Sequence, residues 1–439
     1  MTAEPTAAET TAEPTTADRN AASYRSVLSN RRLAAFVAGD AVSKLGDGMT
    51  FVALPVLALQ LHGPVPPALA VALVTSAPFL LPVVLSLTYG LGRRRFRPRR
   101  ILVADCVLRG GMFTALGIVA SAGALRLPEF AAALFVGSVL RTLSVSSRRL
   151  AATNMVDAHG RLAVNGLLGT SDSFASYVVG PALGGLLTAF GHAPLILLID
   201  GLTYAVLLIV TAIAVPRSVA TTPAATTAAT TTATAPTAAP AERPAAKPAS
   251  GWAILRRTPS VASLLVITFL FNMFYGPVEV AVPLLVTASL HAHSAAIGVL
   301  WTGFGVGALA GAAATNVLRR VPRVPLLLGI VAGWAASMVA LAVAPTVVVA
   351  ALALAVGGLI YGPYTAVSYT ILLDALERDE QQPVLTMWTA ATTVALPLGL
   401  GIGGPLVAGA GARGGLLASA GVTALLVAFG ARWVRGRAA

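Results

Sequence analysis

Residues 33–61 read LAAFVAGDAVSKLGDGMTFVALPVLALQL, a long and mostly apolar stretch. A helix needs about 20 such residues to cross the hydrocarbon core of a bilayer. Similar stretches recur along the chain as far as Val434, and the full sequence of 439 residues is 56% hydrophobic and only 11% charged. This composition fits a lipid environment better than water and predicts an all-α membrane protein.

Twelve apolar stretches predict twelve transmembrane helices. We expect them at 33–61, 68–91, 100–122, 129–149, 163–190, 194–215, 259–289, 296–318, 324–344, 346–374, 383–410 and 414–434. An Ala/Thr/Pro tract at 216–250 cannot bury a core and separates the sixth stretch from the seventh. The predicted parts are a disordered cytoplasmic tail at 1–32, an N-terminal six-helix bundle at 33–215, a flexible cytoplasmic linker at 216–258, and a C-terminal six-helix bundle with a short basic tail at 259–439.

Three pairs of similar segments indicate that the two halves are repeats. VALPVLALQLH at 52–62 resembles VAVPLLVTASLH at 280–291, and GPALGG at 180–185 resembles GPLVAG at 404–409. RRFRPRRIL at 94–102 likewise resembles RRVPRVPLL at 319–327. The offset is about 225 residues each time and the order is the same. We therefore expect two pseudo-symmetric bundles related as parallel repeats.

The net charge of +13 follows the loops and does not mark a nucleic-acid-binding face. If the N-terminus lies inside, the cytoplasmic loops hold most of the arginines, whereas the outer loops hold only Arg126 and Arg413. This asymmetry predicts that both termini are cytoplasmic. The Arg-, Ala- and Gly-rich composition suggests a multi-pass protein of a bacterial plasma (inner) membrane, with the lipid bilayer around it and no nucleic-acid partner.

Sequence patterns of catalysis are missing. The chain has no P-loop, no H-E-x-x-H, no G-x-S-x-G and no Cys/His cluster, and its one cysteine, Cys106, has no partner for an intrachain disulfide. The sequence therefore predicts no enzyme, no cofactor and no metal site.

The order of these features resembles the major facilitator superfamily, and within it the bacterial drug, macrolide and siderophore exporters. The segments that carry the resemblance are AVSKLGDGMTFVALPVLAL at 41–59, ADCVLRGG at 104–111, GPALGGLLTAFG at 180–191 and LLIDGLTY at 197–204. The resemblance covers nearly all of residues 31–435. It implies the major facilitator fold, alternating access, a monomer, and a small-molecule substrate exchanged for protons.

Two motifs of that family have counterparts here. Gly180, Pro181, Gly184 and Gly185 match the antiporter motif that accompanies export in the family, and ordinary small-residue packing is the alternative. The gate loop that follows the second span keeps a basic end but has Arg95 where the family has Asp. We expect Arg95, Arg99 and Arg100 either to use Asp105 as the missing acid, with Arg109 beside it, or to obey only the positive-inside rule.

Ionisable residues inside predicted spans are costly and are therefore candidate functional residues. Asp40, Lys44 and Asp47 lie within about 60° of one another on a helix turning 100° per residue. Asp47 matches the S-x-L-G-D signature of the family and is our first choice for proton carrier or cation contact. For Asp40 and Lys44, a structural ion pair with each other is the alternative.

Further candidates lie in other spans. Glu279 in the seventh span is expected to face the first span and to load and release protons. Asp172 and Asp200 are second-rank acids; Asp200 fits the L-L-I-D pattern of the family but lies towards the outer side, where we expect it to be partly hydrated. Arg141 either tunes a nearby acid or forms a structural salt bridge. Asp105 and Arg109, four residues apart, are also explained by a snorkelling helix pair. The tryptophans either line a drug site or pack and anchor at the membrane interface: Trp301, Trp334, Trp388 and Trp433.

The sequence thus predicts a secondary active transporter that exports small amphipathic molecules in exchange for protons. The coupling residues are expected mainly in the N-terminal half, and the substrate-facing wall mainly in the C-terminal half. The alternatives are a proton-coupled importer or lipid transporter of the same fold, and a non-transporting membrane receptor or assembly protein.

Overall fold

The computed structural model describes residues 24–89, 97–216 and 251–435, and within these ranges every regular element is a helix. Most of the expected tail, most of the expected linker, and Arg95 lie outside the described residues. Tyr24–Leu28 of the expected tail form the short helix α2, and Gly251–Arg257 of the expected linker form α11.

The helices of the first half are α3 (Arg31–Leu61), α4 (Pro67–Tyr89), α5 (Pro98–Ser121), α6 (Leu127–Gly137), α7 (Arg141–Thr153), α8 (Arg161–Phe174), α9 (Gly180–Ala189) and α10 (Ala193–Ala214). Their ends follow local rules. The Asn30 side chain caps α3 by accepting from the backbone N–H groups of Arg32 and Leu33. Proline occupies the first turn of α5, α6 and α10, where its missing N–H costs nothing.

The helices of the second half are α12 (Pro259–Leu284), α13 (Ala295–Ala314), α14 (Arg323–Ala342), α15 (Val347–Tyr361), α16 (Tyr364–Asp374) and α17 (Arg378–Arg435). Single wider π turns extend two of the helices, at η3 (Ala175–Val179) between α8 and α9 and at η4 (Leu285–Ser289) after α12. Helix α17 is not continuous, because Gly411 has the left-handed φ of 74° and divides it into two arms.

Nine helices of the described residues are long and apolar enough to cross a membrane, and the α6–α7 pair, bent by 41°, makes ten. The multi-pass, all-helical fold is therefore confirmed. A count of twelve needs the two arms of α17 to cross separately and the stretch 161–189 to cross as well. Twelve spans in two six-helix bundles stay a prediction.

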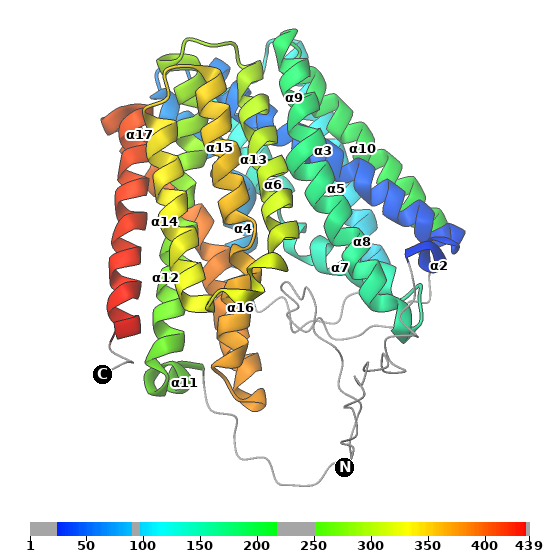
Figure 1. Ribbon diagram of the computed structural model, residues 1–439. Coiled ribbons are helices and arrows are strands. Elements are labelled where there is room, and N and C mark those ends of the chain that lie inside the picture. Colours follow the sequence, from blue (N-terminus) through cyan, green and yellow to red (C-terminus); the bar gives the residue numbers. More distant parts are fainter. Residues whose placement is uncertain (1–23, 90–96, 217–250, 436–439) are drawn as a thin grey trace, which may run out of the picture.

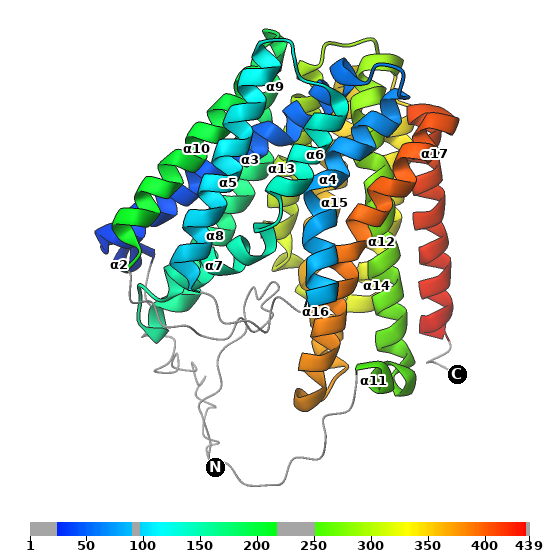
Figure 2. The same ribbon diagram turned by 180° about the vertical axis from the view of Figure 1, so that it is seen from behind.

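The described helices lie in two groups that meet near one end and diverge toward the other (Figure 1). One group contains α3, α5 and α7 to α10, and the other contains α11 to α17. Helix α2 and the C-terminal end of α17 lie at the end where the groups diverge, and the view from behind shows the same separation (Figure 2). Helix α4 packs against α17 where the groups meet.

Small residues allow the two halves to approach closely. A Cβ on Gly185 of α9 would lie 2.9 Å from the Cα of Gly298 on α13. At the second contact, a Cβ on Gly404 of α17 would lie 2.7 Å from the Cβ of Ala72 on α4. Gly404 is the residue of the second repeat that corresponds to Gly180. Corresponding parts of the two repeats therefore form the two contacts.

Candidate functional site

Asp47, near the middle of α3, is the centre of an ion network in the first half. One carboxylate oxygen accepts hydrogen bonds from Arg109 on α5 and from the hydroxyl of Tyr204 on α10, each at 2.8 Å. The other oxygen lies 3.9 Å from the ammonium of Lys44, which in turn pairs with Asp172 on α8 at 3.1 Å. Asp47 thus connects four helices, and its side chain keeps 22% of its surface exposed.

A second group of charges surrounds Arg148, which lies on α7 and is 6% exposed. Its guanidinium donates to Asp40 at 2.7 Å and approaches Asp105 to 3.9 Å. Neither oxygen of Asp105 has a hydrogen-bond partner in the described residues. Arg148 therefore balances two buried carboxylates that come from different helices.

These contacts correct two of our interpretations. Asp40 and Lys44 do not pair with each other, because Asp40 binds Arg148 and Lys44 binds Asp172. Asp105 and Arg109 are not a snorkelling pair, since Arg109 turns to Asp47. Spacing along one helix could not show this, because the partners come from neighbouring helices.

The arginines after the second span do not use Asp105 as their acid. Arg99 donates to the backbone carbonyl of Ala212 at 3.1 Å, and Arg100 is exposed. Asp105 is fully buried and faces Arg148 instead. The interpretation of Asp105 as the missing acid of the gate loop is therefore wrong for the part of that loop that the structure describes.

Asp200 is a fully buried acid on α10 without an ion pair in the described residues. The hydroxyl of Thr50 donates to it at 2.7 Å, and the hydroxyl of Thr203 at 3.2 Å. A Cβ on Gly46 would lie 2.3 Å from its carboxylate, so a glycine is needed there for α10 to approach α3. We expected Asp200 to be partly hydrated, and the structure contradicts this.

Glu279 lies on α12, in the half opposite this network. It is partly buried, and in the described residues its side chain makes neither a hydrogen bond nor an ion pair. The phenol groups of three tyrosines, on η3 and on α12 and α15, are close enough to interact with it electrostatically: Tyr177, Tyr275 and Tyr361. Glu279 thus differs from Asp47, which is held by two cations.

Aromatic side chains fill the second half beside Glu279. Tyr275, one helical turn before Glu279, stacks on Trp334 with ring centroids 5.6 Å apart and lies 6.1 Å from Tyr361. Trp301 completes the group and meets Phe51 of the other half edge to face at 5.1 Å. Trp301 and Trp334 are almost fully buried, as is Trp388, so these three pack internally and do not anchor at the interface. Trp433 lies where side chains are not described.

Arg141 begins α7 at the bend after α6. Its guanidinium stacks on Phe79 of α4, with 4.4 Å from Cζ to the ring centroid. The side chain makes no ion pair in the described residues, so the expected structural salt bridge is not present there. Glu279 of the other half is close enough to Arg141 for the two charges to attract each other, but the two side chains form no ion pair.

The antiporter motif lies at the contact between the halves. Gly180 packs on Gly48 of α3, Gly184 on Met49 of α3, and Gly185 on Gly298 of α13. Pro181 has no N–H to offer to the carbonyl of Tyr177, four residues earlier, and the helix widens there into the π turn. That carbonyl instead points at α13, where a Cβ on Gly305 would lie only 1.8 Å from it.

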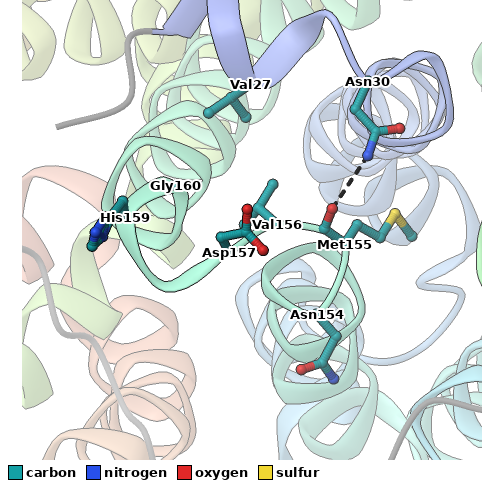
Figure 3. A pocket seen from close by; sticks show the side chains of 8 residues that line it. All are labelled: Val27, Asn30, Asn154, Met155, Val156, Asp157, His159 and Gly160. Carbon is teal, nitrogen blue, oxygen red and sulfur yellow. Dashed lines mark hydrogen bonds between the residues drawn. The ribbon is translucent and has the colours of Figure 1, made fainter. Parts of the chain in front are cut away.

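A separate pocket of about 430 Å³ lies away from this network, beside α2 and the start of α3 (Figure 3). The amide of Asn30 reaches across to the carbonyl of Met155 at 3.2 Å. None of the residues that we predicted for the site lines it. The lining residues are Val27, Asn30, Asn154, Met155, Val156, Asp157, His159 and Gly160.

Three side chains of the network were missed from the sequence. Arg148 was counted only among the loop arginines, although small residues lie one turn before and after it, at Ser144 and Ala152, as they do where helices pack closely. Tyr204 lies four residues after Asp200, on the same helix face, and was within the matched segment LLIDGLTY. Thr50 had no signal, because a threonine in a span usually bonds its own helix backbone.

Comparisons with solved structures agree with this fold. The chain is similar to a bacterial homologue of the iron transporter ferroportin in the inward-facing state, with 14% identity, a TM-score of 0.65, and coverage of 91% of this chain and 98% of that one. The same kind of protein in the outward-facing state gives a TM-score of 0.53 at 14% identity and coverage of 92% and 100%. A D-xylose–proton symporter gives 0.62 at 16% identity and coverage of 91% and 97%.

Comparison of the sequence with family profiles identifies a family. A comparison with curated protein sequences finds no match. The family profile described as Major Facilitator Superfamily matches residues 37–287, which include most of α3 and all of α4 to α12. Together with the multi-pass helical fold, this makes the chain a membrane transporter, which agrees with the prediction that it is not an enzyme. The chain belongs to the Major Facilitator Superfamily.

Proposed function

We propose that the chain exports small amphipathic molecules from a bacterial cell in exchange for protons, by alternating access across the inner membrane. The observation that carries this proposal is Asp47, a partly exposed carboxylate held between Arg109 and Lys44. A proton on Asp47 removes its attraction to both cations at once. Protonation then weakens the connection of α3 to α5, so the charge state of one residue biases the arrangement of several helices.

The antiporter motif supports the exchange of substrate against protons. Its glycines bring α9 onto α3 and onto α13 of the other half, so a shift of α3 is transmitted directly to the contact between the halves. Glu279, on the opposite half and without an ion pair in the described residues, is the second proposed proton site. Asp40, Asp172, Asp200 and Arg141 belong to the same proposed coupling and substrate region.

The conformation supports alternating access. Near Gly185 and Gly298 the halves touch, whereas they diverge toward the end that holds α2 and the end of α17. Loop arginines are concentrated at this second end, which argues for a cytoplasmic location of both termini. The higher TM-score against the inward-facing ferroportin homologue than against the outward-facing one supports an inward-facing state.

Transport in inside-out vesicles tests the proposal. With an acidic lumen, an exporter accumulates ethidium or erythromycin, and uptake stops when the proton gradient is collapsed. We expect Asp47→Asn and Glu279→Gln to abolish gradient-driven uptake. Glu129→Gln, at the exposed start of α6, is the control and keeps it. The assignment fails if both Asp47→Asn and Glu279→Gln transport like the wild type.

Import is the second candidate, because a D-xylose–proton symporter shares this fold. The same vesicles separate the two directions. An importer accumulates the probe in right-side-out vesicles with an acidic exterior and does not concentrate it in inside-out vesicles with an acidic lumen.

A further inference from the structure

Arg141 and Glu279 are opposite charges on opposite halves, and each is left unpaired. Neither side chain makes an ion pair or a hydrogen bond in the described residues, and both are only partly buried. Inside a membrane protein an unpaired charge is costly, so such residues usually mark a ligand. The neighbouring charges are not available as partners, because Asp47 is already bound by Arg109 and Lys44 by Asp172.

The two charges interact but do not touch. Arg141 is close enough to Glu279 for the two charges to attract each other. The two residues do not form an ion pair in the described residues, so their charged atoms are more than 4.0 Å apart. A molecule that neutralises both side chains at once therefore carries a positive group at one end and a negative group at the other, separated by more than one ion-pair distance. An ammonium group suits the carboxylate of Glu279, and a carboxylate suits the planar fork of Arg141.

Aromatic surface lies beside each charge. Phe79 stacks under the guanidinium of Arg141 at 4.4 Å, and Tyr275 precedes Glu279 by one turn. Tyr177, which belongs to the contact between the halves, is half exposed. Ligand sites commonly combine such apolar surface with a few polar groups that fix the orientation.

We propose that Arg141 and Glu279 bind the two ends of a zwitterionic amphiphile, with its amine at Glu279, its carboxylate at Arg141 and its ring system between Phe79, Tyr177 and Tyr275. This assignment rests on the proposed transport function and names the class of its substrate. A ligand held in this way connects the halves, so its binding also favours their approach.

Binding to the purified full-length protein tests the assignment without a proton gradient. The probes share one scaffold: norfloxacin is a zwitterion near neutral pH, its methyl ester is a cation, and N-acetylnorfloxacin is an anion. Isothermal titration is expected to show norfloxacin binding at least about tenfold more tightly than either derivative. Equal affinities, tighter binding of one derivative, or no saturable binding of norfloxacin overturns the proposal.

Two variants assign the charges to the residues. Arg141→Gln is expected to lower norfloxacin affinity to that of the methyl ester, without changing the affinity for the ester. Glu279→Gln is expected to lower norfloxacin affinity to that of the N-acetyl form, without changing the affinity for that form. Arg149→Gln, two turns along α7 from Arg141 and without an ion pair in the described residues, is the matched control and leaves all three affinities unchanged. If Arg141→Gln or Glu279→Gln lowers the affinity for all three probes equally, the residue has a structural role, and this also overturns the proposal.

The binding and transport results are separable. If norfloxacin binds through both charges but the vesicles show no gradient-driven movement, the ligand assignment holds and the exporter assignment falls. If gradient-driven export is seen while the three probes bind equally, export stands and the zwitterion site does not.

Discussion

Arg148 balances two carboxylates that are both nearly inaccessible to solvent. Asp40 lies on α3, Asp105 on α5 and Arg148 on α7, so one guanidinium connects three helices of the first half. Asp200 is stabilised differently, through hydroxyl groups and without a cation in the described residues. These two arrangements predict opposite responses to substitution.

Replacing Arg148 by Gln is expected to destabilise the protein strongly. The change leaves Asp40 and Asp105 buried without a counter-charge, and removal of one partner of a buried ion pair costs about 3–5 kcal/mol. Unfolding in detergent by heat or by SDS measures the loss. The same substitution at Arg149, the next residue of α7, is the control. A stability of Arg148→Gln equal to that of this control contradicts the role given to Arg148.

Replacing Asp200 by Asn is expected to leave stability within about 1 kcal/mol, because the amide oxygen still accepts from the hydroxyl of Thr50. Asp200→Ala, in contrast, leaves that hydroxyl buried without an acceptor and costs about 1–3 kcal/mol. The same unfolding assay compares the two variants. If Asp200→Asn is as unstable as Asp200→Ala, then the carboxylate charge itself is required for folding. If Asp200→Asn is stable and transports normally, Asp200 is not a proton carrier.

At the scale of elements, proline and glycine act together. Pro181 leaves the carbonyl of Tyr177 without its helical partner, and that carbonyl lies against Gly305. The same arrangement occurs inside the second half, where Pro277 frees the carbonyl of Met273 against Gly399. In each case the neighbouring helix has a glycine where a Cβ would lie 1.8 Å from the carbonyl oxygen.

Gly305→Ala is therefore expected to disturb the contact between the halves. Its Cβ would fall 1.8 Å from the Tyr177 carbonyl oxygen, so α13 has to move away from η3. Overpacking of this kind costs about 1–3 kcal/mol, and 1.4 kcal/mol changes a conformational ratio about tenfold. We expect the halves to separate at this end and to approach at the other.

Pulsed EPR distances between Asn154→Cys and Asp379→Cys labels, in a Cys106→Ala background, measure that shift. The population with the shorter distance is expected to grow at least about tenfold in Gly305→Ala. Gly169→Ala is the matched control, because a Cβ there has open space. An unchanged distance distribution in Gly305→Ala shows that the contact does not govern the conformation.

The sequence predicted the positions of these elements better than their breaks. Apolar length located the helices, and the GPALGG motif located α9. The π turn at Ala175–Val179 and the bend between α6 and α7 fall inside the stretches 163–190 and 129–149, each of which was predicted as one continuous span. The partners of Asp40 and Lys44 were also missed, since they lie on other helices and depend on how α3, α7 and α8 pack.

At the scale of the whole molecule, each half contributes a helix of its repeat to a contact with the other half. Gly185 of the first half meets Gly298 of the second, and Gly404 of the second meets Ala72 of the first. The ionisable residues are distributed unevenly over this symmetry. The first half holds the network around Asp47 and Arg148, whereas the second half presents Glu279 beside aromatic rings, which agrees with the expected division between coupling and substrate contact.

The orientation of the whole molecule in the membrane is also testable. The arginine-rich loops predict that Asp379, at the start of α17, faces the cytoplasm and that Arg126, before α6, faces outward. Both side chains are exposed, so Asp379→Cys and Arg126→Cys are accessible in a Cys106→Ala background. A membrane-impermeant maleimide is expected to label Arg126→Cys at least about tenfold more in right-side-out than in inside-out vesicles, and Asp379→Cys in the reverse ratio. This contrast follows from the charge asymmetry of the loops, each positive charge of which resists translocation. Labelling of both positions from the same side contradicts the prediction that the chain between them crosses the membrane. If instead Asp379→Cys is labelled from outside and Arg126→Cys from inside, the termini lie outside and the proposed inward-facing state is an outward-facing one.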